Sequence, residues 1–230
     1  RVRLLEQDYA LHSDPKVVDQ LHAGLDGLNA QAEQLKASSA VNQQVMGEVQ
    51  QALAAYRKSF DEFVSISQSK DLALEMASWS VSSVANNLDV LQAGLADDGA
   101  YGLKDSQGQQ GGEFIEQSNQ VSQISKLMMQ AMDEARVRLD KSRKTGSGEE
   151  AKTGQIEQAI QAQELAEQLK GVIKDAGYLT VLTEVGGHIT NFSDKLNEYT
   201  GLLDSEAKVS AQLATNAKTV VQQGNQAYDA

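Results

Sequence analysis

Apolar residues recur every four and then three positions along residues 41–95, which predicts one long amphipathic helix. This alternation keeps a narrow stripe on one side of a helix. Neither proline nor glycine interrupts it between Gly47 and Gly94. At about 1.5 Å per residue the helix would extend for about 80 Å. A compact globule of this chain length has a radius of gyration of only about 17 Å, so we expect an elongated protein. The stripe comprises Val49, Leu53, Tyr56, Phe60, Phe63, Ser67, Lys70, Leu74, Ala77, Val81, Val84, Leu88, Leu91 and Leu95.

Two shorter helices are predicted before the long one. Leu4 and Leu11, one heptad apart, indicate a helix over residues 1–11. The chain then breaks at residues 12–15, where Asp14 suits the N-cap and Pro15 the first position of the next helix. That helix is expected to end near residues 37–39. Its stripe is Val18, Leu21, Leu25, Leu28, Ala32 and Leu35.

Three further helices are predicted in the second half of the chain. The glycine-rich residues 97–112 should end the long helix and form a loop. A helix then covers residues 114–139 and closes at residues 145–148, and the last helix runs from Tyr178 to the end of the chain with the same spacing. Between them lies a helix that carries Ile156, Ile160, Leu165, Leu169 and Ile173.

An internal repeat relates the two halves of the chain. Arg-Val-Arg-Leu occurs at residues 1–4 and 136–139, and Ala-Glu-Gln-Leu occurs at residues 32–35 and 166–169. The pattern predicts an all-α protein in which a helix–helix–long helix unit is used twice, giving two stacked four-helix bundles that share the two long helices. One bundle would contain residues 1–11, 71–96, 112–143 and 207–230, and the other residues 14–70 and 148–206. Lys70 and Glu206, polar residues within the two stripes, should face each other near the junction.

Composition agrees with a helical bundle and narrows the functional classes. The 230 residues are 40% hydrophobic, only 5% aromatic and include one proline. A formal net charge of −12 argues against nucleic-acid and anionic-membrane surfaces as partners. Cysteine is absent, and the three histidines lack metal-ligand spacing, so we expect no metal centre. The carboxylates form no recognisable acid–base pair, and no cofactor motif is present, so we expect no enzymatic activity.

Several motifs together resemble the helical bimodular sensor domain of bacterial chemoreceptors and sensor kinases. They are the Arg-rich and acidic-aromatic run at residues 1–9, the turn at residues 12–15, and the segment Ala-Tyr-Arg-Lys-Ser-Phe-Asp-Glu-Phe at residues 55–63. The resemblance covers the whole chain. It implies a periplasmic, homodimeric ligand-binding domain between two transmembrane helices, one before Arg1 and one after Ala230. Such domains bind small organic acids, such as C4 dicarboxylates, citrate or acetate, and signal by helix displacement.

The arginines point to a carboxylate site. Four of the six arginines lie in the two Arg-Val-Arg turns, and a guanidinium group binds a carboxylate through two hydrogen bonds. We expect the site in the membrane-proximal bundle, the one that contains residues 1–11. Members that bind dicarboxylates carry arginine on the last helix, where this chain has none, so Lys218 or a hydroxyl would replace it. The candidate ligand-binding residues are Arg1, Arg3, Arg136, Arg138, Ser210, Thr215 and Lys218.

Other interpretations remain open at this point. Each arginine could instead be an exposed helix charge paired with a nearby carboxylate. The aromatic residues Tyr56, Phe60, Phe63, Phe192 and Tyr199 are expected to fill the membrane-distal core, although tyrosine hydroxyls there could also meet a ligand. The whole domain could dock a periplasmic binding protein rather than a free ligand, or it could be a structural helical spacer without a pocket.

Overall fold

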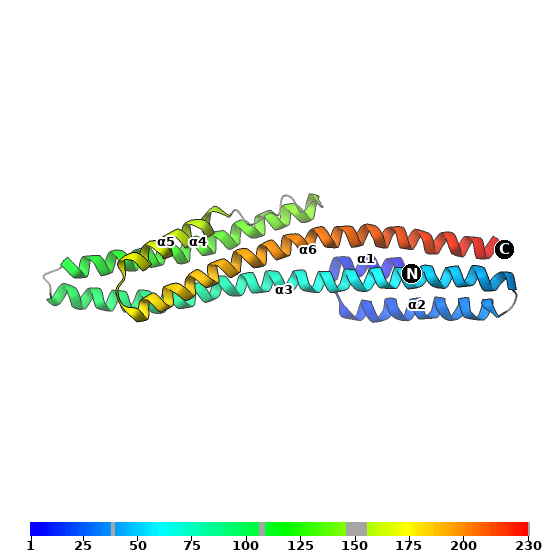
Figure 1. Ribbon diagram of the computed structural model, residues 1–230, viewed down its shortest axis with the longest axis horizontal. Helices are drawn as coiled ribbons and strands as arrows, with labels where there is room; N and C mark the ends of the chain where they lie inside the picture. The colour runs from blue at the N-terminus through cyan, green and yellow to red at the C-terminus, as the bar shows by residue number, and fades with distance from the viewer. Residues whose placement is uncertain (38–39, 106–108, 146–155, 230) are drawn as a thin grey trace. The chain divides into compact units, whose positions relative to one another are not determined.

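The computed structural model describes residues 1–37, 40–105, 109–145 and 156–229 (Figure 1). These residues form six α-helices and no strand, which confirms the predicted all-α class. The two longest helices, α3 and α6, have 66 and 54 residues, and each follows two shorter helices. The helices are α1 (Val2–His12), α2 (Pro15–Lys36), α3 (Ala40–Asp105), α4 (Gln109–Thr145), α5 (Glu157–Val172) and α6 (Ala176–Asp229).

The turn between α1 and α2 follows the predicted chemistry. Ser13 ends α1 in the left-handed conformation, with φ 52°, and its N–H donates to the carbonyl of Tyr9. The carboxylate of Asp14 accepts the N–H of Lys16, which caps α2, and Pro15 occupies the first turn of α2. This geometry reverses the chain, so that α2 runs back along α1 (Figure 1).

The predicted loop at residues 97–112 is largely wrong. α3 continues through Gly99 to Asp105, and α4 begins at Gln109. Gly99 is buried and lies four residues after Leu95, so it extends the inward-facing stripe of α3. Glycine within a helix costs only about 1 kcal/mol relative to alanine, and packing along the stripe outweighs that cost. The predicted turn at residues 146–148 lies outside the described residues.

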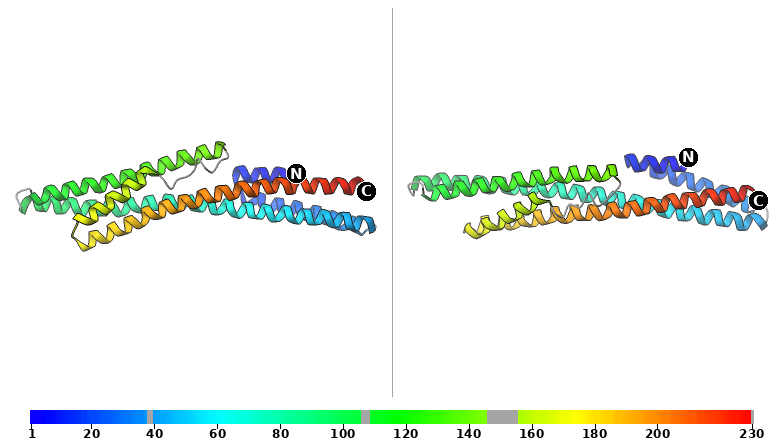
Figure 2. Two further views of the ribbon diagram at one scale, coloured as in Figure 1. Left: turned by 45° about the horizontal axis from the view of Figure 1, so that its top comes forward. Right: turned by 90° about the horizontal axis from the view of Figure 1, so that it is seen from above.

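The helices form two compact units that divide the chain differently from the predicted bundles. The first unit contains Arg1–Ser69 and Asp204–Ala230, and the second contains Lys70–Leu203. α1 and α2, which we had expected in different bundles, both belong to the first unit, because the reversal at Ser13 folds them against each other. α4 and α5 likewise pack together in the second unit. In each unit a segment of α3 runs antiparallel to a segment of α6 (Figures 1 and 2).

Each unit has an apolar core built by four helical segments. In the first unit Tyr9 of α1, Leu21 of α2, Phe60 of α3 and Leu213 of α6 are all almost fully buried. The predicted stripe of α3 is confirmed at most positions in both units. The aromatic residues expected in one core are divided between the two units: Tyr56, Phe60 and Phe63 lie in the first, and Phe192 and Tyr199 in the second.

The predicted inward face of α1 is wrong, whereas that of α5 is wrong only at Ile160. Leu4 and Leu11 are 69% and 79% exposed, and α1 instead buries Glu6 and Tyr9. Of the predicted stripe at α5, Ile160 is 42% exposed, but Ile156, Leu169 and Ile173 are buried and Leu165 packs against the core. The buried face of α5 consists of Ala159, Ala162, Ala166 and Leu169. Leu4 and Leu139, which occupy equivalent positions in the proposed sequence repeat, differ completely in burial, so that tetrapeptide does not mark equivalent positions in the structure.

The polar residues within the long stripes find partners inside their own units. In the first unit the hydroxyl of Ser67 donates to Glu206 at 2.9 Å. In the second unit the Lys70 ammonium group lies 6.0 Å from the centre of the Tyr199 ring. Lys70 and Glu206 belong to different units, so their predicted pairing stays a prediction.

Candidate functional site

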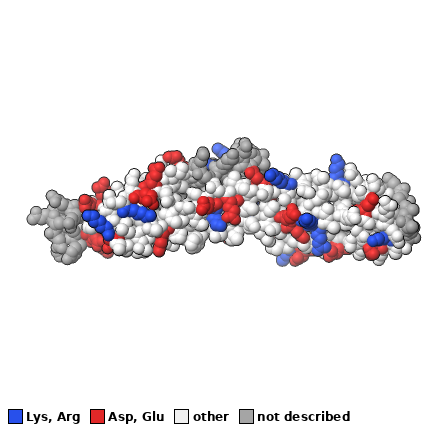
Figure 3. Space-filling model, viewed as in Figure 1, with Lys and Arg blue, Asp and Glu red and all other residues white. Residues whose placement is uncertain are grey.

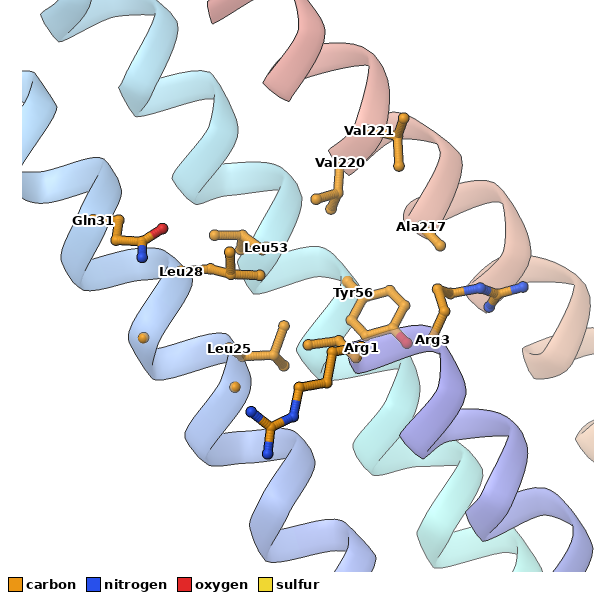
Figure 4. A pocket seen from close by; sticks show the side chains of 13 residues that line it. Arg1, Arg3, Leu25, Leu28, Gln31, Leu53, Tyr56, Ala217, Val220 and Val221 are labelled. Atoms are coloured by element: carbon orange, nitrogen blue, oxygen red, sulfur yellow. The ribbon is translucent and has the colours of Figure 1, made fainter. Parts of the chain in front are cut away.

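The first unit contains a cavity of about 480 Å³ that opens beside the start of α1 (Figure 4). All four helical segments of the unit contribute to its wall. Most of the wall is apolar, and the only charged side chains that line it among the described residues are Arg1 and Arg3. The lining residues are Arg1, Val2, Arg3, Gly24, Leu25, Gly27, Leu28, Gln31, Leu53, Tyr56, Ala217, Val220 and Val221.

Arg3 is held by the buried carboxylate of Glu6. The Arg3 guanidinium donates to both carboxylate oxygens of Glu6, at 2.7 and 2.5 Å. The Tyr56 hydroxyl donates to the same carboxylate at 2.6 Å. Glu6 is only 9% exposed, and a carboxylate withdrawn from water is tolerated when it is paired and hydrogen-bonded. Arg3 and Tyr56 together therefore make it possible for α1 to turn Glu6 inward.

The pKa of Tyr56, which belongs to this cluster, is strongly raised. Burial raises the pKa of Tyr56, and the adjacent Glu6 carboxylate raises this pKa further. Both effects oppose the formation of a second negative charge next to Glu6. Tyr56 therefore remains a neutral hydrogen-bond donor over the physiological pH range, and its ring forms part of the cavity wall (Figure 4).

Arg1 is available for a ligand, whereas Arg3 is paired with Glu6. Its side chain is exposed and makes no hydrogen bond or ion pair with the side chains of the described residues. In Figure 4 the Arg1 guanidinium extends toward α2, whereas that of Arg3 extends toward α6. A guanidinium group can bind a carboxylate through two parallel hydrogen bonds. Arg1 thus provides an anion-binding group at the edge of an apolar cavity.

Close packing of α1 on α2 positions the two arginines. A side chain on Gly24 would place its Cβ 3.1 Å from Cγ2 of Val2, which lies between Arg1 and Arg3 in the sequence. In contrast, a Cβ on Gly27 would meet nothing within 4 Å, because it would project into open space. The two glycines of α2 therefore have different roles: Gly24 permits the approach of α1, and Gly27 leaves the cavity open.

A second cavity of about 450 Å³ lies next to the first. The two share Leu28, Gln31, Leu53 and Val220, so they adjoin each other between α2, α3 and α6. No charged side chain lines the second cavity among the described residues. Its remaining wall comprises Ala32, Leu35, Met46, Val49 and Gly224.

The structure brings together only two of the seven predicted ligand-binding residues. Arg1 and Arg3 line the cavity. The three predicted partners on the last helix, Ser210, Thr215 and Lys218, are exposed and not among its lining residues. Thr215 turns its hydroxyl to the carbonyl of Ala211 within α6, and the small residue Ala217 faces the cavity instead.

Arg136 and Arg138 do not belong to this site. Both lie on α4 in the second unit. Arg136 is exposed, and Arg138 donates to Glu134 at 3.0 Å, one helical turn away. The interpretation of these arginines as helix surface charges therefore agrees with the structure better than a role beside Arg1.

Sequence reasoning missed Glu6 and did not assign Tyr56 to the site. Val2, Glu6 and Tyr9 have the four-three spacing of an inward-facing stripe, and this spacing could have indicated that Glu6 is buried. A carboxylate in the middle of such a stripe, however, argues against burial of that face. Leu4 and Leu11 were the more apolar choice. Only the pairing of Glu6 with Arg3 and Tyr56 explains the observed face, and the sequence separation of Tyr56 conceals that pairing.

Other surface features of the described residues are less distinctive. On the face shown in Figure 3, Lys and Arg side chains stand singly or in small groups among Asp and Glu. A shallow depression in the second unit is lined by both acidic and basic side chains, including Asp89, Lys126 and Asp133. Within the described ranges, no three His, Asp or Glu residues are placed to hold a metal ion.

Two further results bear on the type of protein. None of the helices, over the part of the chain that the structure describes, contains an apolar stretch long enough to cross a membrane. Comparisons with protein-family models and with curated protein sequences find no match for this chain.

Proposed function

We propose that this chain is the periplasmic sensor domain of a bacterial chemoreceptor and that its first unit binds a small carboxylate. One observation carries the proposal: Arg1 presents an uncommitted guanidinium group at a mostly apolar cavity of about 480 Å³. Ligand sites of small molecules typically measure about 300–1,000 Å³ and combine apolar walls with a few polar groups. A helical spacer has no need for such a cavity, since it gains stability from filling its core.

The surroundings of Arg1 favour an anion. The apolar wall reduces screening by water, so an ion pair formed there is stronger than one on an open surface. Arg3, neutralised by Glu6, would help to position the ligand rather than compete for it. The Tyr56 ring and the residues Leu25 and Leu53 would cover the rest of a small ligand.

The output of this site is helix displacement, because the cavity lies between the first and the last helix. Arg1 and Arg3 belong to α1, and Ala217, Val220 and Val221 belong to α6. A ligand that contacts both helices favours whichever packing gives it the better contacts. In the proposed receptor each chain forms two stacked four-helix bundles, two such chains form a homodimer, and α1 and α6 connect to the transmembrane helices.

Thermal-shift and calorimetric measurements with this domain would test the proposal. The ligands are acetate, succinate, citrate, butanoate and longer carboxylates, with amines of matched length as controls. A carboxylate that binds only the folded domain raises the melting temperature. We expect Arg1→Gln to abolish this shift. Arg136→Gln, which removes the same charge from the second unit, should leave it unchanged.

The outcomes separate the three functional classes. Binding of a carboxylate that is lost in Arg1→Gln and retained in Arg136→Gln supports the sensor. Loss in Arg136→Gln alone would place the site in the second unit and overturn the assignment to this cavity. If no acid binds, the proposal fails, and docking of a periplasmic binding protein or a spacer role becomes the better account.

A further inference from the structure

We infer that the ligand of the first unit is a monocarboxylate with a hydrocarbon tail, whose carboxylate binds Arg1 and whose tail extends from the first cavity into the adjoining second cavity. This inference rests on the proposed function, because it specifies the ligand of the same site. It differs from the expectation of a dicarboxylate or citrate. Three observations support it: the charge at the cavity, its polar groups, and the extent of its apolar wall.

The charge at the cavity suits one carboxylate. Arg1 and Arg3 contribute two positive charges, and the buried Glu6 compensates one of them through its contacts with Arg3 at 2.7 and 2.5 Å. The remaining positive charge is that of Arg1. A ligand with a single carboxylate would neutralise it, whereas a dicarboxylate would bring one negative charge more than the site can balance.

Apart from Arg1, the polar groups of the wall offer a second carboxylate no uncompensated positive charge. Besides the arginines, only Gln31 and Tyr56 among the described lining residues have polar side chains. The Tyr56 hydroxyl already donates its single proton to Glu6 at 2.6 Å. An ionised carboxylate placed against the apolar wall would lose its hydration without a charged partner. A methylene chain placed there gains from leaving water.

The apolar wall continues well beyond Arg1. From Tyr56, in the first cavity, to Met46, in the second, the wall follows ten residues of α3, or about 15 Å along the helix axis. Leu53 and Val220 line both cavities, which therefore adjoin. This length accommodates an extended tail in line with α3, and it exceeds what acetate or a C4 acid can occupy.

Two acids of equal length test the inference against the proposed function. Octanoate and octanedioate differ by a second carboxylate at the far end, and butanoate shares the head group of octanoate with a shorter tail. Each buried methylene contributes about fourfold in affinity (about 0.8 kcal/mol). By calorimetry we expect octanoate to bind at least tenfold more tightly than both butanoate and octanedioate.

A glycine variant locates the tail. Gly224 lines the second cavity, and a Cβ at this position would meet nothing within 4 Å. Gly224→Leu should therefore fill part of the second cavity without disturbing Arg1. It should weaken octanoate at least tenfold and leave butanoate within twofold. The matched control is Gly187→Leu, also on α6 and also in open space, but in the second unit.

The results are distinguishable. Equal or tighter binding of octanedioate or succinate, compared with octanoate, would overturn the inference while leaving the carboxylate sensor intact. Unchanged octanoate affinity in Gly224→Leu, with far-ultraviolet circular dichroism showing a folded domain, would also overturn it. If none of the acids binds, both the inference and the proposed function fail.

Discussion

Asn191 on α6 donates a hydrogen bond to the hydroxyl of Ser80 on α3, with a nitrogen–oxygen distance of 2.5 Å. Ser80 is fully buried and donates its own proton to the carbonyl of Met76, one turn earlier. The same arrangement occurs in the first unit, where Asn216 donates to the buried Ser59 at 2.6 Å. Each unit thus has one asparagine–serine contact that aligns the antiparallel segments of α3 and α6.

The Ser80–Asn191 contact should be energetically coupled. Ser80→Ala and Asn191→Ala each remove the hydrogen bond between these side chains, so each should lower the free energy of unfolding by about 0.5–1.5 kcal/mol. The double variant should lose less than the sum of the two, with a coupling energy of about 0.5–1.5 kcal/mol. Urea denaturation of all four proteins measures this coupling. Ser82→Ala, at an exposed position of α3, is the control and should have little effect; strictly additive losses would contradict the prediction.

The Tyr56–Glu6 contact should make the domain sensitive to alkaline pH. In the folded protein the pKa of Tyr56 is raised above its usual value of 10.0, whereas in the unfolded chain it is not. Above about pH 10 unfolding therefore releases a proton, and the stability that this tyrosine contributes at lower pH is lost as the pH rises. The loss approaches about 1.4 kcal/mol per pH unit. Urea unfolding from pH 8 to 11 should show a steeper decline for the native chain than for Tyr56→Phe; parallel declines would exclude this effect.

Gly94 should be intolerant of a side chain. A Cβ at this position would lie 2.6 Å from the hydroxyl of Tyr178, which donates to Asp98 at 2.7 Å. The ring must shift in Gly94→Ala, and that contact is lost. Gly187→Ala meets no such obstacle and should stabilise α6 by about 0.5–1 kcal/mol. We expect Gly94→Ala to be less stable than Gly187→Ala by about 1–2 kcal/mol in thermal or urea unfolding. Equal stabilities would show that Tyr178 moves at no cost.

The alanine face of α5 should be sensitive to larger side chains. Ala162 is fully buried, whereas Ile160 is 42% exposed. Ala162→Leu should overfill the core of the second unit and lower the free energy of unfolding by about 1–3 kcal/mol. Ile160→Gln should change it by about 0.5 kcal/mol at most, since surface substitutions usually have small effects. If urea denaturation showed a larger loss for Ile160→Gln than for Ala162→Leu, the predicted inward position of Ile160 would be favoured instead.

The sequence pattern predicted the long helices well because their stripes combine large apolar residues with regular spacing. From Leu53 to Leu95 nearly every predicted stripe position of α3 is buried or partly buried. The pattern failed on α1, whose buried face contains Glu6, and it missed the small alanines of α5, which are buried where Ile160 was expected. Side-chain size is a poor guide there: a short helix packed closely against its neighbours buries small residues, and a carboxylate enters the core when distant residues pair with it.

The candidate site was predictable only in part. Arg1 and Arg3 stand out as positive charges in an acidic chain, and both line the cavity. The other residues of the cavity wall could not be inferred, because the sequence pattern assigned α1 and α2 to separate bundles. That assignment did not place α2 beside the two arginines. That assignment depended on whether the turn at Ser13 continues the direction of the chain or reverses it. A single left-handed residue decides this, and serine gives no strong signal for that conformation.

The division of the chain into units allows the second unit to be deleted or inserted as one continuous segment. The second unit is one uninterrupted segment, Lys70–Leu203, whereas the first is assembled from both ends of the chain. Close to the points where the chain leaves and re-enters the first unit, Ser67 and Glu206 are hydrogen-bonded at 2.9 Å. A single deletion closed by a short turn would therefore remove the second unit and retain every residue of the arginine-lined cavity. By the same geometry, one insertion into a four-helix bundle built like the first unit would give the arrangement of the whole chain.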